Sequence, residues 1–93
     1  MTVKFFAYIR DKDYAGLKED TFPTYSSLRD LGKAMSERYG EKFASEFFSP
    51  DGNELGERII VLINGRRSEF CGGIDAPLKE SDTVLVFPVV AGG

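Results

Sequence analysis

Two almost continuously apolar runs, one near each end of the chain, predict strands at the centre of a sheet. Residues 3–9 read VKFFAYI and residues 83–87 read TVLVF, a pattern typical of strands buried on both faces. Residues 17–22 are more polar and predict a second, more exposed strand. Because polar residues and Gly16 separate the first two strands, we expect them to form an opening hairpin.

An amphipathic helix is predicted after the second strand, which Pro23 ends. Thr24, Ser26 or Ser27 can cap its amino end, and Gly40 is the expected stop. The helix has one apolar stripe at 3.6-residue spacing, made of Leu28, Leu31, Met35 and Tyr39. This stripe is expected to pack on one face of the sheet.

Residues 41–57 show the weakest pattern in the chain. Phe43 and Phe47 are at i and i+4, which predicts a short helical turn over the core. The turn-forming sequence PDGN follows at residues 50–53. This segment is therefore expected to cover the core and then turn back toward the sheet.

A second hairpin is predicted around Asn64-Gly65, the strongest short hairpin signal in the chain. Residues 58–63 (RIIVLI) form its first strand and residues 67–71 its return strand. The order hairpin, helix, hairpin, strand predicts an α+β fold of the β-grasp, or ubiquitin-like, type, with a mixed sheet of about five strands and one main helix on one face. Residues 1–88 are then a single domain, and residues 89–93 a flexible tail.

The composition excludes several classes of function. A chain of 93 residues is one domain, and its net charge of −3, from 12 Lys/Arg and 15 Asp/Glu, does not favour nucleic acid. It has no His and one Cys, Cys71, which excludes an internal disulfide, a Cys/His zinc site and a His-based triad. No run approaches the roughly 18 apolar residues of a membrane span, and no signal core follows the start, so a cytoplasmic protein is expected.

The terminal pair Gly92-Gly93 is the remaining candidate for chemistry. Two residues without Cβ atoms make a slim end that can thread into a narrow nucleotide site. Adenylation would turn the poorly electrophilic carboxylate of Gly93 into a mixed anhydride, from which the acyl group can pass to sulfur or to an amine. The alternative interpretation is that the glycines are only a frayed end.

Most of the chain resembles one known family. Residues 64–93 (NGRRSEFCGGIDAPLKESDTVLVFPVVAGG) and residues 3–16 (VKFFAYIRDKDYAG) are similar to the MoaD/ThiS family, which includes the small, sulfur-carrying subunit of molybdopterin synthase. The resemblance implies that a ubiquitin-activating-type (MoeB-like) adenylyltransferase uses ATP to adenylate Gly93. A sulfurtransferase then converts Gly93 to a thiocarboxylate. No metal or cofactor is expected on the isolated chain.

The same resemblance implies where a partner binds. The tail would insert into a large (MoaE-like) subunit of molybdopterin synthase and give sulfur to the pterin precursor of the molybdenum or tungsten cofactor. Phe6, Arg10 and Phe87 match positions that face the partner. The tail residues expected to enter the partner with Gly92 and Gly93 are Pro88, Val89, Val90 and Ala91.

Simpler interpretations of these residues remain open. Phe5 and Phe6 can both be core, Arg10 can be a solvated strand end, and Phe87 can belong to the core or to an interface. Val89 departs from the family, which often has a second proline there. Cys71, on the predicted return strand, is expected to be a small buried hydrophobe rather than a sulfur acceptor, because no neighbouring base or cation supports a reactive thiolate.

Three functions are compatible with the sequence. The first is a sulfur carrier for molybdenum or tungsten cofactor synthesis, or for another sulfur-containing metabolite. The second is a ubiquitin-like modifier whose activated Gly93 is joined to lysines of target proteins. The third is a β-grasp interaction domain with an inert tail.

Overall fold

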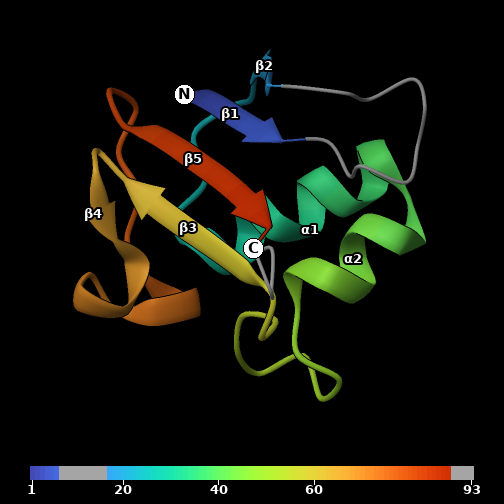
Figure 1. The fold of residues 1–93 in the computed structure, drawn as a ribbon. Coiled ribbons are helices and arrows are strands. Elements are labelled where there is room, and N and C mark those ends of the chain that lie inside the picture. Colours follow the sequence, from blue (N-terminus) through green and yellow to red (C-terminus); the bar gives the residue numbers. More distant parts are fainter. Residues whose placement is uncertain (7–16, 89–93) are drawn as a thin grey trace.

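A mixed sheet forms the centre of the fold. The computed structural model describes residues 1–6 and 17–88, without the side chains of Phe6, Leu17, Lys18 and Pro88. The sheet has five strands in the order β2-β1-β5-β3-β4, and helices α1 and α2 lie on one side of it (Figure 1). The strands are β1 (Thr2–Phe6), β2 (Leu17–Thr21), β3 (Ile59–Ile63), β4 (Arg66–Arg67) and β5 (Thr83–Pro88).

The first and last strands lie side by side at the centre of the sheet, as predicted. β1 and β5 run parallel, with Val3 opposite Val84 and Phe5 opposite Val86. β2 pairs antiparallel with β1, and β3 pairs antiparallel with β5. The opening hairpin and the mixed sheet are therefore confirmed, while residues 7–9 of the predicted first strand lie outside the described residues.

Helix α1 (Leu28–Tyr39) begins and ends where the sequence predicts. The Ser27 hydroxyl accepts a hydrogen bond of 3.3 Å from the backbone N–H of Asp30, which satisfies one of the free donors of the first turn. Gly40 ends the helix with a φ of 100°, a value that favours glycine. The expected stripe faces the sheet, with Leu28, Leu31 and Met35 fully buried and Tyr39 half-buried.

Helix α2 (Glu41–Phe47) covers the core beside α1. Phe43 and Phe47 are both buried and their ring centres lie 5.5 Å apart, which confirms the predicted helical turn. Gly32 of α1 lets α2 approach closely, because a Cβ atom there would lie 2.3 Å from a ring carbon of Phe47. The helical layer thus consists of two helices rather than one.

The Asn64-Gly65 turn joins β3 to β4 as predicted. Both residues have positive φ, 52° and 83°, which suits a tight hairpin turn. The Asn64 side chain donates a hydrogen bond of 2.7 Å to the carboxylate of Asp82. The side-chain carbonyl oxygen of Asn64 accepts a hydrogen bond of 2.9 Å from the backbone N–H of Thr83. The turn is thereby fixed against the start of β5.

The predicted return strand over residues 67–71 is wrong. β4 ends at Arg67, and two 3₁₀ helices follow, η2 (Ser68–Phe70) and η3 (Gly73–Asp75). A strand would show buried and exposed side chains in alternation. Here Ser68 is buried, but Glu69 and Phe70 are both exposed, Phe70 at 78%. Cys71 therefore lies in a turn rather than on a strand, and it packs partly against the core.

The division into a domain over residues 1–88 and a tail over residues 89–93 stays a prediction, because the tail lies outside the described residues. Among the helices of the described part, none is both long and apolar enough to cross a membrane.

Candidate functional site

The sheet face opposite the helices presents half-buried apolar side chains. Val61, Val84 and Val86 point into the core and are at most 2% exposed. The residues between them on β3 and β5 lie on the other face, because side chains of a strand alternate. We call this surface the open face, and it consists of Ile60, Leu62, Leu85 and Phe87, all of intermediate exposure.

The strand register brings the four residues of the open face together. Ile60 is opposite Phe87, and Leu62 is opposite Leu85. Side chains that are directly opposite in an antiparallel pair are neighbours on one face of the sheet. The open face is therefore one continuous apolar patch, of the kind that a protein partner covers.

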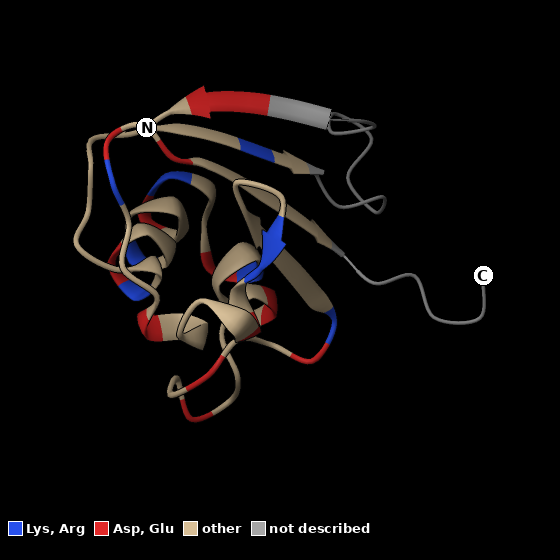
Figure 2. Cartoon of the chain, turned by 90° about the vertical axis from the view of Figure 1, so that its left-hand side faces the viewer, with Lys and Arg blue, Asp and Glu red and all other residues tan. Residues whose placement is uncertain are grey.

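Charged residues are distributed unevenly around the open face. Lys4 is opposite Leu85 and Arg67 is opposite Leu62, so both cations flank the patch. Arg67 also forms an ion pair of 2.9 Å with Glu69. Figure 2 shows the basic β4 and the acidic β2, which form opposite edges of the sheet. This polarity can orient a partner on the open face.

The tail begins at the end of the open face. β5 ends at Pro88, which is opposite Ile59, one residue beyond the Phe87–Ile60 pair. β1 runs parallel to β5, and its Phe5 is opposite Val86. The backbone of Phe6, the next residue of β1, therefore lies toward the same end of the sheet as Phe87 and Pro88. The open face and the start of the tail are consequently adjacent.

The structure describes only some of the predicted site residues. Phe87 lies on the open face and is half-buried, and its role in an interface stays a prediction. Phe5 is 5% exposed and belongs to the core, whereas Phe6 and Pro88 are described by their backbones alone. The predicted residues that lie outside the described part are Arg10, Val89, Val90, Ala91, Gly92 and Gly93.

Sequence reasoning missed Ile60, Leu62 and Leu85 as surface residues. The continuous apolar run of β5 predicted a strand buried on both faces, and the run of β3 predicted a strand without assigning its faces, but the helices cover one face of the sheet only. A signal was present, because a sheet with helices on one side needs apolar residues at alternate positions only. The apolar residues of β3 and β5 that exceed this requirement are the four residues of the open face.

The described residues contain no conventional catalytic constellation. No group of three or more potential metal ligands occurs among residues 1–6 and 17–88, and the whole chain lacks His. Cys71 follows η2, and its backbone N–H donates a hydrogen bond of 2.9 Å to the carbonyl of Ser68.

The sequence and the fold are similar to known proteins. The ThiS family matches residues 3–93, nearly the whole chain. A putative molybdopterin converting factor, subunit 1, from Pyrococcus furiosus is 30% identical, with a TM-score of 0.59, over 96% of this chain and 98% of that one. The small archaeal modifier protein 1 (SAMP1) from Methanosarcina acetivorans is 25% identical, with a TM-score of 0.70, over 99% and 96%.

A third similar structure supports the fold alone. A chain of the BexX/CysO complex from Amycolatopsis orientalis is 22% identical, with a TM-score of 0.73, and the match covers 98% of this chain and 99% of that one. Together with the SAMP1 structure, it confirms the predicted β-grasp, ubiquitin-like fold.

Proposed function

Because the chain belongs to the ThiS family of ubiquitin-like sulfur carriers, we propose that it is the small, sulfur-donating subunit of a molybdopterin synthase. In this role it supplies the sulfur of the pterin that holds molybdenum or tungsten. The chain does not catalyse the transfer alone. Its partners are a large synthase subunit, an activating adenylyltransferase and a sulfurtransferase, all in the cytoplasm.

The proposed chemistry takes place at the carboxylate of Gly93. A carboxylate oxygen attacks the α-phosphorus of ATP on the activating enzyme, and pyrophosphate leaves. A sulfide equivalent from the sulfurtransferase then attacks the acyl carbon, and AMP leaves with the oxygen that it gained. The result is a thiocarboxylate in which one sulfur replaces one oxygen, and hydrolysis after sulfur transfer restores the carboxylate.

The observation that supports this proposal is the adjacency of the open face to the start of the tail. A partner that covers Ile60 and Phe87 also meets the chain where it leaves β5 at Pro88. Five residues remain after Pro88, and a fully extended chain spans at most about 3.5 Å per residue. A partner on the open face would therefore receive Gly93 at a depth of up to about 17 Å.

The choice of molybdenum or tungsten cofactor synthesis is supported by similarity to one solved structure. The protein from Pyrococcus furiosus that is named a putative molybdopterin converting factor, subunit 1, is the most identical of the three structures compared. A second candidate, a protein modifier conjugated to lysines through Gly93, is favoured by the likeness to the archaeal modifier protein. A sulfur carrier for another pathway shares the first two chemical steps.

The first test is the intact mass of the protein isolated from its own cells under mild, non-reducing conditions. The proposal expects a species heavier by about 16 Da, from oxygen-to-sulfur exchange, that maps to Gly93 and reacts with an alkylating agent. The Cys71→Ser variant is the control and should behave identically. An unmodified mass, with the activating enzyme and sulfur supply abundant, would contradict sulfur carriage.

A second test separates the acceptors. Thiocarboxylated protein is mixed with the large subunit and the pterin precursor, and the dithiolene product is measured. Product formation that depends on the thiocarboxylate supports the synthase role. Sulfur retained on the chain in this assay, together with isopeptide-linked adducts in cell extract, would instead establish the modifier.

A further inference from the structure

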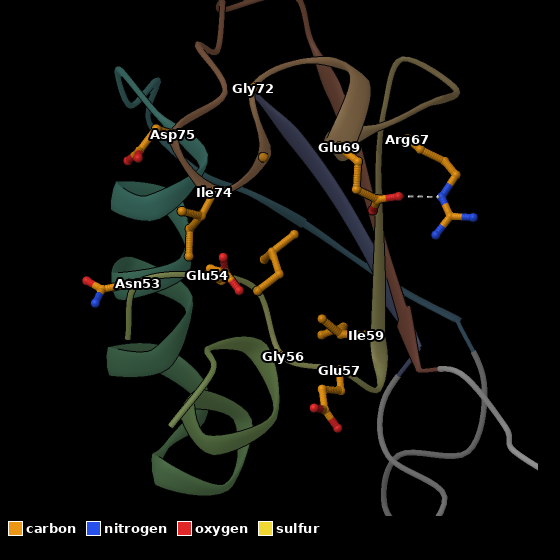
Figure 3. A pocket seen from close by; sticks show the side chains of 12 residues that line it. Asn53, Glu54, Gly56, Glu57, Ile59, Arg67, Glu69, Gly72, Ile74 and Asp75 are labelled. Carbon is orange, nitrogen blue, oxygen red and sulfur yellow. Dashed lines mark ion pairs between the residues drawn. The ribbon is translucent and has the colours of Figure 1, made fainter. Parts of the chain in front are cut away.

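A groove lies on the side of the molecule away from β1 and β2, between the loop that precedes β3 and the two 3₁₀ helices (Figure 3). Its volume is about 660 Å³, within the range of roughly 300–1,000 Å³ typical of ligand sites. Ile59 and Ile74, which are 7% and 6% exposed, and Leu55 provide its apolar lining. None of these residues belongs to the open face.

The groove is acidic. Its charged lining residues are Glu54, Glu57, Glu69, Asp75 and Arg67. Asp75 is neutralised by Arg29, and Glu69 by Arg67, each across 2.9 Å. The carboxylates of Glu54 and Glu57 take part in no ion pair or side-chain hydrogen bond within residues 1–6 and 17–88. Two unpaired negative charges therefore stand beside apolar surface.

The walls of the groove are fixed from behind. Arg29 donates hydrogen bonds of 2.9 Å to Asp75 and 2.8 Å to the carbonyl of Gly52, so one side chain ties η3 to the opposite loop. Gly56 packs so closely on α2 that a Cβ atom there would lie 2.1 Å from the carbonyl oxygen of Glu46. A wall held in this way loses little freedom when a ligand binds.

A lysine or arginine side chain matches this lining, because its aliphatic stem can cover apolar surface while its cationic head meets a carboxylate. The opposite wall leaves room for a main chain as well. A Cβ atom at Gly73 would meet nothing within 4 Å. Gly73, Glu54 and Glu57 all line the groove, so a bound segment of polypeptide would have both carboxylates among its neighbours.

We propose that this groove is a second protein-docking site, which binds a lysine- or arginine-bearing segment of a partner protein. The apolar residues of the groove are different from those of the open face, although Arg67 borders both surfaces. The groove would let one partner hold the chain from the side while another covers the open face. The proposal does not depend on the chemistry of Gly93.

The test uses the full, unmodified chain and a blocked, fluorescent peptide of sequence Gly-Ser-Lys-Ala-Lys-Ser-Gly. We expect amide chemical-shift changes concentrated at residues 54–57 and 69–75. In fluorescence anisotropy, the double variant Glu54→Gln/Glu57→Gln should bind roughly fivefold more weakly. A peptide with glutamine in place of both lysines should bind no better to either protein.

The control variant Glu37→Gln/Glu80→Gln removes the same charge from exposed positions outside the groove and should bind within about twofold of the parent protein. Equal weakening in this control would show attraction to net charge and overturn the proposal, as would shift changes elsewhere. Cadaverine, with the same two ammonium groups, should not displace the peptide at equal concentration. Displacement would identify a site for free diamines instead.

Discussion

The hydroxyl of Tyr39 donates a hydrogen bond to the carboxylate of Asp20, which joins the last turn of α1 to the edge strand β2. A guanidinium nitrogen of Arg38 lies 3.7 Å from the same carboxylate, and the guanidinium carbon lies 4.0 Å from the ring centre of Phe22. Burial, and secondarily the bond to Asp20, raise the pKa of Tyr39 well above its ordinary value. Neutral Tyr39 therefore stabilises the attachment of β2.

Tyr39→Phe should lower the free energy of unfolding by about 1 kcal/mol at pH 7, because it removes the hydrogen bond but keeps the ring. The ring still packs on Phe5 and Phe43, at centre distances of 4.6 and 5.5 Å. Urea unfolding measures the change. The raised pKa means that the folded protein favours the neutral phenol over the phenolate. The extra stability of the parent protein over Tyr39→Phe should therefore decrease as the pH rises above about 10. Equal stability at pH 7 would contradict the assigned bond.

Gly32→Ala should destabilise the fold by about 2 kcal/mol, although alanine is the better helix former. The new methyl group would lie 2.3 Å from a ring carbon of Phe47 and 2.9 Å from one of Phe48, which forces α1 and α2 apart. Thermal or urea unfolding measures the loss. The control Lys33→Ala, at the next and exposed position of α1, should change stability by less than about 0.5 kcal/mol. A more stable Gly32→Ala protein would refute the close helix contact.

Leu62→Lys should weaken binding to the proposed activating enzyme or large subunit by roughly thirtyfold, because it places a charge in the centre of the open face. Its free energy of unfolding should change by about 1 kcal/mol or less, since Leu62 is only half-buried. Calorimetric titration measures binding. Phe70→Ser, which removes a 78% exposed aromatic ring outside the open face, is the matched control. If both variants bind equally well, the open face is not the docking surface.

Asp75→Asn should loosen the groove by releasing Arg29. The hydrogen bond from Arg29 holds the pKa of Asp75 below its ordinary value. The resulting stabilisation is present above the ordinary carboxyl pKa of about 3.9 and is lost as the pH falls through the lowered native pKa. At pH 6 the free energy of unfolding of the variant should be lower than that of the parent protein, and the loss should be smaller than the loss caused by Gly32→Ala. The difference between variant and parent should disappear toward pH 3. A gap that stays constant with pH would show that charge is not responsible.

Local signals sufficed for most of the fold. The Ser27 cap, the buried stripe of α1 and the Gly40 stop all depend on residues close together in sequence. The Asn64-Gly65 turn is equally local, because both residues adopt the positive φ that this dipeptide tolerates. The failed return strand shows the limit, since the chain leaves the sheet at Ser68 to form η2.

The candidate site was harder to predict because it depends on long-range contacts. The position of Phe87 beside Ile60 follows from strand register, which no local pattern defines. The groove combines residues near Glu54 with residues near Gly73, held together by Arg29 of α1. Only the tertiary arrangement shows which residues share each of these surfaces.

The parallel pairing of β1 with β5 has a consequence for the folding of the protein. Val3 lies opposite Val84, so the central pair of the sheet joins two strands that are far apart in the sequence. Such non-local pairing slows folding, because the long loop between the strands must close first. The open face is complete only when β5 has paired with β1 and β3, so an activating enzyme that binds only the folded sheet would reject chains in which β5 has not yet docked.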